Sequence, residues 1–154
     1  MRHRCSLVVF AHSILDVASL DYCYLGYMLR PNDWTNLIAK KLIKLGSIHD
    51  AQKIADASML EYLRRRALSR RLKLIIERCA KDATVSIVGF TFDLDRIRAF
   101  EELRNQIIHH PDFETTSGGI GEMLHYLLHA HDYIATMFAA SHELEVPGVT
   151  KPLC

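Results

Sequence analysis

Apolar residues recur every three to four positions along most of the chain, which is the spacing of one face of an α-helix. This pattern predicts helices over about 6–29, 32–45, 48–80, 94–109 and 120–144. The recurring apolar positions of the first helix are Leu7, Phe10, Ile14, Val17, Leu20, Tyr24 and Tyr27. We expect this helix to be buried, and because His12, Asp16 and Asp21 interrupt it, we do not expect it to span a membrane.

Proline and capping residues mark where these helices begin and end. Pro31 ends the first helix, since the residue before a proline is pushed out of the helical region. Asn32 is a favourable N-cap for the second helix, and Asp93 is one for the fourth. Because of Pro111, the fourth helix is predicted to stop at 109–110.

Two segments do not follow the helical period. Residues 83–92 are rich in β-branched and aromatic side chains, and since a single strand would have no partner, we expect an extended connection lying on the helices. Residues 147–154 have no periodicity and are predicted to form a loose tail. The chain of 154 residues fits one domain. The prediction is therefore an all-α bundle of about four to five helices over 1–146, followed by that tail.

Charge is distributed unevenly along the chain. Residues 1–81 hold 15 Lys and Arg against 7 Asp and Glu, whereas residues 82–154 hold 4 against 11. This polarity suits a basic surface for an anionic partner or two opposite faces that meet in a dimer; drift of composition is the alternative. The densest basic cluster is Arg64, Arg65, Arg66, Arg70, Arg71 and Lys73. Because it spreads around the predicted helix, a solvated face is a more frequent explanation than RNA binding, unless another site requires RNA.

The four cysteines of the chain are widely spaced and form no C-x-x-C pair. Neither a zinc knuckle nor a redox dithiol is therefore indicated, and no cofactor is expected. Reduced thiols are typical of a cytoplasmic protein, which is where we expect the chain to act.

One arginine occupies a position where an apolar residue is expected. On a helical wheel of 94–109 the apolar arc comprises Ile97, Phe100, Leu103, Ile107 and Ile108. Arg104 lies inside that arc, and Asn105 and His109 share its polar edge. A guanidinium facing a core needs partners for up to five N–H donors, so a chance placement is disfavoured. The pattern Arg-Asn-x-x-x-His is expected about 0.01 times by chance in a chain of this composition, against about 0.7 times for Arg-x4-His alone.

The segment 102–109, Glu-Leu-Arg-Asn-Gln-Ile-Ile-His, resembles the signature of the HEPN superfamily. Its members are small helical-bundle domains of prokaryotic toxins, abortive-infection proteins and RNA-cleaving effectors. The resemblance implies a HEPN-like fold and a metal-independent endoribonuclease whose site forms across a homodimer interface. It further implies RNA as the partner and allows an antitoxin protein, as in toxin–antitoxin systems. One toxin branch carries tyrosine where this chain has Pro111, so that branch's chemistry and antitoxin are not carried over.

The residue types fit this chemistry. His109 can move protons near neutral pH while the RNA 2′-hydroxyl attacks the phosphate, and Arg104 can hold the phosphoryl oxygens with a fixed fork of donors. Asn105 can orient either group. The products would be a 2′,3′-cyclic phosphate and a 5′-hydroxyl end. Arg104 and His109 lie about 140° apart on a helix, so we expect Arg104 to meet the partner's His109 in a dimer.

The sequence also allows other roles for these residues and another function for the chain. Glu101 can neutralise Arg104 within the helix, and His110 can replace His109. The chain can also be a non-catalytic helical module that binds RNA, protein or metal. His125 and His129, four apart on a predicted helix, are the weak metal candidate, since no third ligand is identifiable and no metal is expected.

Overall fold

The fold is described from a computed structural model that covers residues 2–43, 51–80, 85–110 and 117–144. The helices are α1 (Arg2–Leu29), α2 (Pro31–Trp34), α3 (Ala39–Ile43), α4 (Ala51–Arg64), α5 (Leu68–Cys79), α6 (Leu94–His109) and α7 (Ser117–Ser141), with a 3-10 turn η1 (Thr35–Leu37) between α2 and α3. Within these ranges every regular element is helical, which confirms the all-α prediction. The predicted tail lies outside the described residues.

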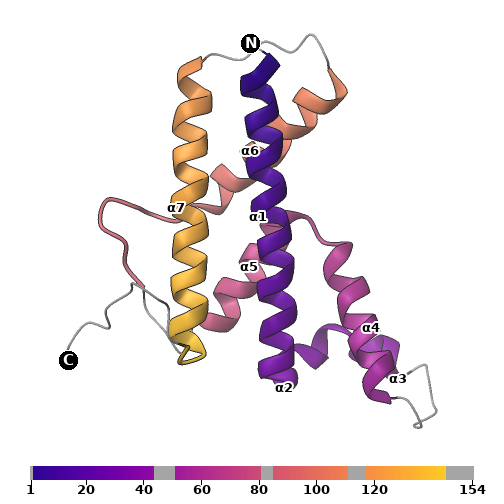
Figure 1. Cartoon of the computed structure of the whole chain (residues 1–154). Helices are drawn as coiled ribbons and strands as arrows, with labels where there is room; N and C mark the ends of the chain where they lie inside the picture. The colour runs from indigo at the N-terminus through magenta and orange to yellow at the C-terminus, as the bar shows by residue number, and fades with distance from the viewer. Residues whose placement is uncertain (1, 44–50, 81–84, 111–116, 145–154) are drawn as a thin grey trace.

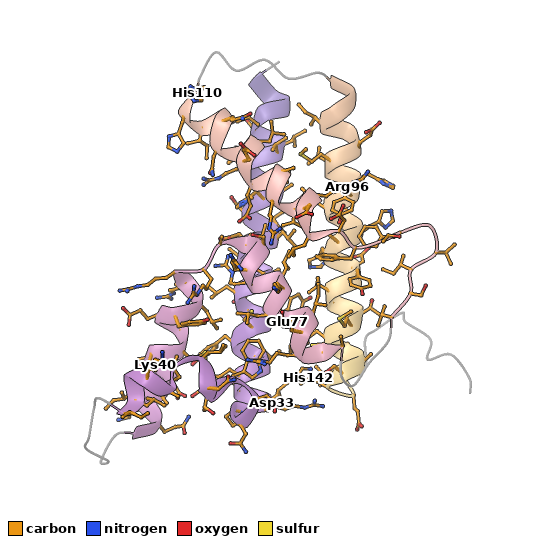
Figure 2. All side chains as sticks on the ribbon, turned by 180° about the vertical axis from the view of Figure 1, so that it is seen from behind. Asp33, Lys40, Glu77, Arg96, His110 and His142 are labelled. Carbon is orange, nitrogen blue, oxygen red and sulfur yellow. The ribbon has the colours of Figure 1, made fainter. Side chains whose placement is uncertain are left out.

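The long helices form two layers (Figure 1). α1 and α7 lie side by side and run in the same direction, and α5 and α6 cross behind them. Figure 2, seen from the opposite side, shows α5 and α6 in front of that pair. The short helices and α4 pack at one end of α1. The core lies between the layers, where fully buried side chains from α1, α5, α6 and α7 meet, among them Val8, Leu72, Ile75, Ile97 and Ile134.

α1 is apolar on two opposite sides, and the structure corrects part of the prediction of which side is buried. The side that faces the core carries Val8, Leu15, Ser19, Cys23 and Tyr27. Of the seven predicted positions, Tyr27 is buried and Leu20 and Tyr24 pack partly against the core, as expected, whereas the other four are exposed: Leu7, Phe10, Ile14 and Val17. A helix that is apolar all round gives no periodic signal that distinguishes its two faces. By length and composition alone, Ser6–Leu29 is also apolar enough to cross a membrane, although its inner side is packed against the other helices.

The helix predicted over 48–80 is interrupted. α4 ends at Arg64 and α5 begins at Leu68, with Ala67 in an extended conformation between them. The break lets Leu63 at the end of α4 and Leu68 and Leu72 in α5 all be buried in one core. A single straight helix could not turn these side chains toward the same core.

The second predicted helix is also divided into shorter pieces. Its first helical residue is Pro31, so Asn32 is not the N-cap; the fixed φ of proline suits the first position of a helix. The 3-10 turn η1 then separates α2 from α3. This irregular path allows the Trp34 side chain to be buried against Gly26 of α1.

Gly26 is expected to tolerate no larger side chain. A Cβ at this position would lie 2.8 Å from Cζ2 of the Trp34 ring and 3.4 Å from Cε2 of Phe138. We predict that Gly26→Ala lowers the free energy of unfolding by about 1–3 kcal/mol, measured by urea denaturation, because both rings are packed and cannot shift freely. Gly121→Ala is the control, since a Cβ there meets nothing within 4 Å and a helical alanine should stabilise α7 by about 0.5–1 kcal/mol. Equal stability of Gly26→Ala and the wild type would contradict this packing.

The start and end of α6 were predicted correctly. The Asp93 carboxylate accepts a hydrogen bond from the backbone N–H of Asp95 at 2.8 Å, and α6 ends at His109. The described part of the segment before it, 85–92, lies on α7 as expected, with the Phe90 ring 5.3 Å from the Tyr126 ring. It is not extended throughout, because a turn at Val88 and Gly89 brings Ile87 and Phe90 together in a single antiparallel bridge. The Tyr126 hydroxyl donates to the carbonyl of Asp93 at 2.9 Å. These contacts fix where α6 begins, and therefore where its motif lies.

Candidate functional site

Arg104 lies half-buried on the inner side of α6, one turn after the buried ring of Phe100. Its Nη1 donates a hydrogen bond to Oδ1 of Asn105 at 2.9 Å. Its Nε is buried and has no hydrogen-bond partner within the described part of the chain. An unpaired buried donor on a charged group is costly, so this guanidinium has capacity for a further acceptor.

The chain's own core occupies the first half of the arc that carries Arg104. Ile97 and Phe100 are buried against the neighbouring helices, Leu103 and Ile107 pack at the edge of this core, and Ile108 is 43% exposed. The contact of this face with a second chain stays a prediction.

His12 of α1 lies beside this position. Its ring stacks on the Phe100 ring, with centroids 5.6 Å apart and planes inclined by 27°. Phe100 and Arg104 are four residues apart and so share a face of α6, which brings Arg104 near His12 where the two helices cross. α6 crosses behind α1 in Figure 1 and in front of it in Figure 2. The structure thus brings His12 and Arg104 to the same helix crossing within one chain.

The environment of His12 favours its neutral form. Burial is the main reason that its pKa is lowered from the ordinary value of 6.5. Nearby charges act in both directions: Asp16 and Glu101 raise the pKa, whereas Arg104 and Arg71 lower it. These groups come from α1, α5 and α6, so His12 lies at the junction of three helices. A neutral imidazole can accept a proton, which a general base must do.

The pKa of His12 is expected to respond to its α6 neighbours. Arg104→Ala removes a positive charge and should raise this pKa, whereas Glu101→Gln removes a negative charge and should lower it further. An NMR titration of the His12 ring, assigned with His12→Gln, measures both shifts. Arg98→Ala, an exposed arginine on the same helix, is the matched control. An unchanged pKa in Arg104→Ala would contradict the proximity of the two side chains.

Because the folded pKa of His12 lies below the unfolded value, its contribution to stability has a defined sign. Above about pH 6.5 the imidazole of His12 is neutral in both the folded and the unfolded chain, so its ionisation does not change the free energy of unfolding. As the pH falls below that value, the unfolded chain takes up the proton first, so the free energy of unfolding should decrease. Replacing His12 by glutamine should remove this part of the pH dependence.

Arg71 does not belong to an RNA-binding surface, because its side chain is only 3% exposed. Its Nε donates to Oγ of Ser19 at 2.9 Å, and Nη2 donates to the carboxylate and the carbonyl of Asp16. Its Nη1 donates to the carbonyls of Leu63 and Arg66, at the end of α4, at 3.2 and 2.6 Å. Arg71 therefore fastens the turn between α4 and α5 to α1, one helical turn beyond His12.

The other predicted RNA-binding residues are exposed. Arg64, Arg65, Arg66 and Arg70 gather at the α4–α5 turn, and Lys73 follows on α5. Arg71 bonds both to the carbonyl of Arg66 in this turn and to Asp16 of α1. The turn that carries the exposed arginines is therefore held beside α1, one helical turn from His12. Two of these five side chains form ion pairs. Arg65 pairs with Glu61, and Nζ of Lys73 lies 3.5 Å from Oε1 of Glu77. The other three, Arg64, Arg66 and Arg70, form no ion pair among the described residues.

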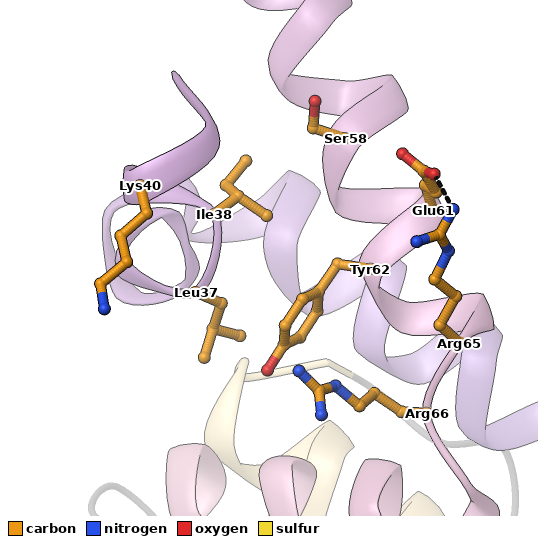
Figure 3. A pocket seen from close by; sticks show the side chains of 8 residues that line it. All are labelled: Leu37, Ile38, Lys40, Ser58, Glu61, Tyr62, Arg65 and Arg66. Atoms are coloured by element: carbon orange, nitrogen blue, oxygen red, sulfur yellow. Dashed lines mark hydrogen bonds and ion pairs between the residues drawn. The ribbon is translucent and has the colours of Figure 1, made fainter. Parts of the chain in front are cut away.

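A shallow pocket lies next to this turn (Figure 3). It is lined by Leu37, Ile38, Lys40, Ser58, Glu61, Tyr62, Arg65 and Arg66. The guanidinium of Arg66 lies over the Tyr62 ring, 4.3 Å from its centroid. The pocket therefore combines one aromatic ring and two arginines with the carboxylate of Glu61.

The remaining predicted site residues are not joined to Arg104. His109 and His110 are exposed at the end of α6, and no hydrogen bond links either to Arg104 or Asn105 within the described residues. Glu101 is half-buried, but none of the ion pairs between described residues joins it to Arg104. The Glu101–Arg104 pair that would have explained the arginine structurally is therefore not formed.

The histidine pair on α7 converges, but lacks further ligands. Nε2 of His125 and Nε2 of His129 are 3.2 Å apart, close to the edge of about 3.3 Å expected for two nitrogens on one tetrahedral zinc ion. Over the described ranges, no group of three or more His, Cys, Asp or Glu side chains could hold a metal. The pair lies on the same helix as Tyr126, away from the α1–α6 crossing, with the His129 ring packed on Phe90.

No protein-family model matches the chain, and neither the curated proteins nor the solved structures include a match. The candidate site therefore rests on its own geometry. That geometry adds His12 and Asp16, which sequence analysis treated only as interruptions of an apolar helix. Their relation to Arg104 depends on contacts between segments almost ninety residues apart, for which the local sequence carries no signal.

Proposed function

We propose that the chain is a cytoplasmic, metal-independent endoribonuclease of the HEPN kind. The observation that carries this proposal is that Arg104 and His12 lie at the same helix crossing. Arg104 is half-buried and its Nε has no hydrogen-bond partner among the described residues, and the pKa of His12 is lowered, so its neutral form is favoured. A phosphate would bind the guanidinium of Arg104 through its Nη atoms, since Nε itself is buried, and the exposed arginines of the α4–α5 turn would guide RNA toward it. The sequence motif itself remains a resemblance, and the defence or toxin role it suggests is part of the proposal.

The reaction needs one group that accepts a proton and one that donates a proton. As the 2′-oxygen forms its bond to phosphorus, its proton passes to a base; as the bond from phosphorus to the 5′-oxygen breaks, an acid supplies that oxygen with a proton. Arg104 would stabilise the charge on the phosphoryl oxygens, with Asn105 holding its guanidinium. In the proposed reaction His12 would make one proton transfer and the exposed His109 would make the other. We propose that both belong to the same chain as Arg104, with the bound RNA lying between Arg104 and His109, which are not in contact with each other.

The experiment is RNA cleavage by the purified protein in EDTA, with analysis of the product ends. We expect cleavage that EDTA does not inhibit and that leaves 2′,3′-cyclic phosphate and 5′-hydroxyl termini. If no RNA is cut with or without added divalent metal, the proposal fails and the chain is better described as a binding module. Cleavage that requires a metal would contradict the mechanism.

Mixing two inactive variants tests where the site forms. A site shared between chains would regain activity when Arg104→Ala and His109→Ala proteins exchange subunits, because one mixed site would contain both intact residues. A site within one chain predicts no recovery, and this is the result we expect. Recovered activity would restore the dimer-shared site implied by the HEPN resemblance.

A further inference from the structure

α1 carries an apolar stripe, interrupted by Asp21, on the side opposite the core. Six large side chains on it are between 44% and 64% exposed: Leu7, Phe10, Ile14, Val17, Leu25 and Met28. Exposed apolar residues that occur singly need no explanation, but a row of them along one helix marks an interaction surface. We propose that this stripe, the α1 stripe, binds the α1 stripe of a second copy of the chain in an antiparallel arrangement.

The spacing of the α1 stripe matches helix-to-helix pairing. Leu7, Ile14 and Met28 are separated by multiples of seven residues, and Phe10 and Val17 by seven. A seven-residue apolar repeat is what two helices need to remain in contact along their length as they wind around each other. From Leu7 to Met28 the stripe covers about 32 Å of helix, at 1.5 Å per residue.

The size of the stripe is sufficient for a dimer. At about 200 Å² for a large side chain, and roughly half exposed, six such residues offer on the order of 600 Å² per chain. A standard protein interface buries about 800 Å² on each partner, including the rim around its apolar centre. The two self-complementary stripes therefore account for most of one two-fold interface.

Charge favours a second copy over a membrane surface. Helices that lie on membranes carry lysines and arginines along the side of their apolar face. The arginines of α1, Arg2 and Arg4, lie in its first turn, and Ser6–Leu29 contains neither lysine nor arginine. The exposed Asp21 lies in the middle of the stripe, where a lipid bilayer would have to accept a carboxylate, whereas at a protein interface such a group can face a polar residue of the partner.

Asp21 also determines the direction of pairing. In a parallel pair the two Asp21 carboxylates would face each other in an apolar seam, and like charges in that position repel. In an antiparallel pair centred on Val17, each Asp21 would lie opposite the partner's Ser13, a polar residue that is exposed in one chain. The two carboxylates would then be separated by about 12 Å along the helix, at 1.5 Å per residue.

This dimer leaves the candidate site uncovered. His12, which contacts Phe100 of α6, lies half a helical circumference from the α1 stripe, so the crossing of α1 and α6 faces away from the partner. The inference does not depend on RNA cleavage and can succeed or fail independently of it. It names the α1 stripe, separate from the Arg104 face, as a surface through which two chains associate.

The oligomeric state of the full chain, measured by sedimentation velocity over a range of micromolar concentrations, tests the proposal. We expect a dimer for the wild type, and an increase of about 100-fold or more in the dimer Kd for Val17→Glu, because a charge would enter the centre of the seam. Val88→Glu is the matched control, since Val88 is fully exposed outside α1. A monomeric wild type, or equal dissociation of the two variants, would overturn the proposal.

Disulfide formation tests the direction without a destabilising charge. Val17→Cys lies near the two-fold axis and should link two chains under mild oxidation, whereas Leu7→Cys should not. Efficient linkage through Leu7→Cys would indicate a parallel pair. Binding of the wild type to vesicles of phosphatidylcholine and phosphatidylserine, in place of dimerisation, would identify a membrane as the occupant and overturn the proposal.

Discussion

Replacing Arg71 by alanine is expected to lower the free energy of unfolding by about 3 kcal/mol. The substitution removes hydrogen bonds to Ser19, Asp16 and two carbonyls at the end of α4. The carbonyl of Leu63 would be left without this donor in the core. The loss falls at the lower end of the range for buried ion pairs because the Asp16 side chain is 43% exposed and water can solvate it in the variant.

The adjacent arginine provides a control of the same chemistry. Arg70 is exposed, so Arg70→Ala should change stability by no more than about 0.5 kcal/mol. Urea denaturation of the two variants measures the difference directly. Similar stability of Arg71→Ala and Arg70→Ala would show that Arg71 does not fasten α4 and α5 to α1. In RNA-binding measurements the order should reverse, since Arg70 is accessible to a phosphate and Arg71 is not.

The contrast between these two arginines shows what the sequence could not distinguish. Both belong to one basic run, and a helical wheel of a continuous helix over 48–80 places neither in the core with certainty. The break at Ala67 rotates α5 relative to α4 and turns Arg71 inward, toward Asp16. Which arginine is buried therefore depends on a tertiary contact between α5 and α1, not on local composition.

α1 shows a second limit of sequence patterns. Its length and its end before Pro31 follow from the apolar run and the proline. The apolar pattern does not show whether Val8 or Leu7 faces the core, because both sides of the helix are apolar. In contrast, the cap at Asp93 and the end of α6 at His109 depend on local chemistry and were predicted correctly.

The candidate site was predictable in part. Arg104 was identified because a guanidinium on an apolar arc conflicts with the rest of that arc, and the structure places it half-buried there. The roles of Asn105, His109 and His110 remain predictions. His12 could not be recognised, since a histidine within an apolar helix has no local signature and its contact with Phe100 exists only in the folded chain.

Replacing Arg104 by alanine is expected to have the largest effect on activity. If its guanidinium stabilises the charge on the phosphoryl oxygens, removing it should lower kcat/KM for RNA cleavage by about 100- to 1000-fold. Arg104→Lys should recover only part of this activity, because a single ammonium cannot reproduce the fork of donors. Stability should change little by comparison, since Nη1 bonds only to the neighbouring Asn105.

The most direct test of the proposed site is therefore the RNA cleavage rate of Arg104→Ala beside that of Arg98→Ala, measured in EDTA with both proteins shown to be folded. Arg98 lies on the same helix, is exposed and pairs only with Asp95, so it controls for the general loss of one positive charge from α6. The site predicts a loss of at least about 100-fold for Arg104→Ala and at most a few-fold change for Arg98→Ala. Equal rates for the two variants would contradict it.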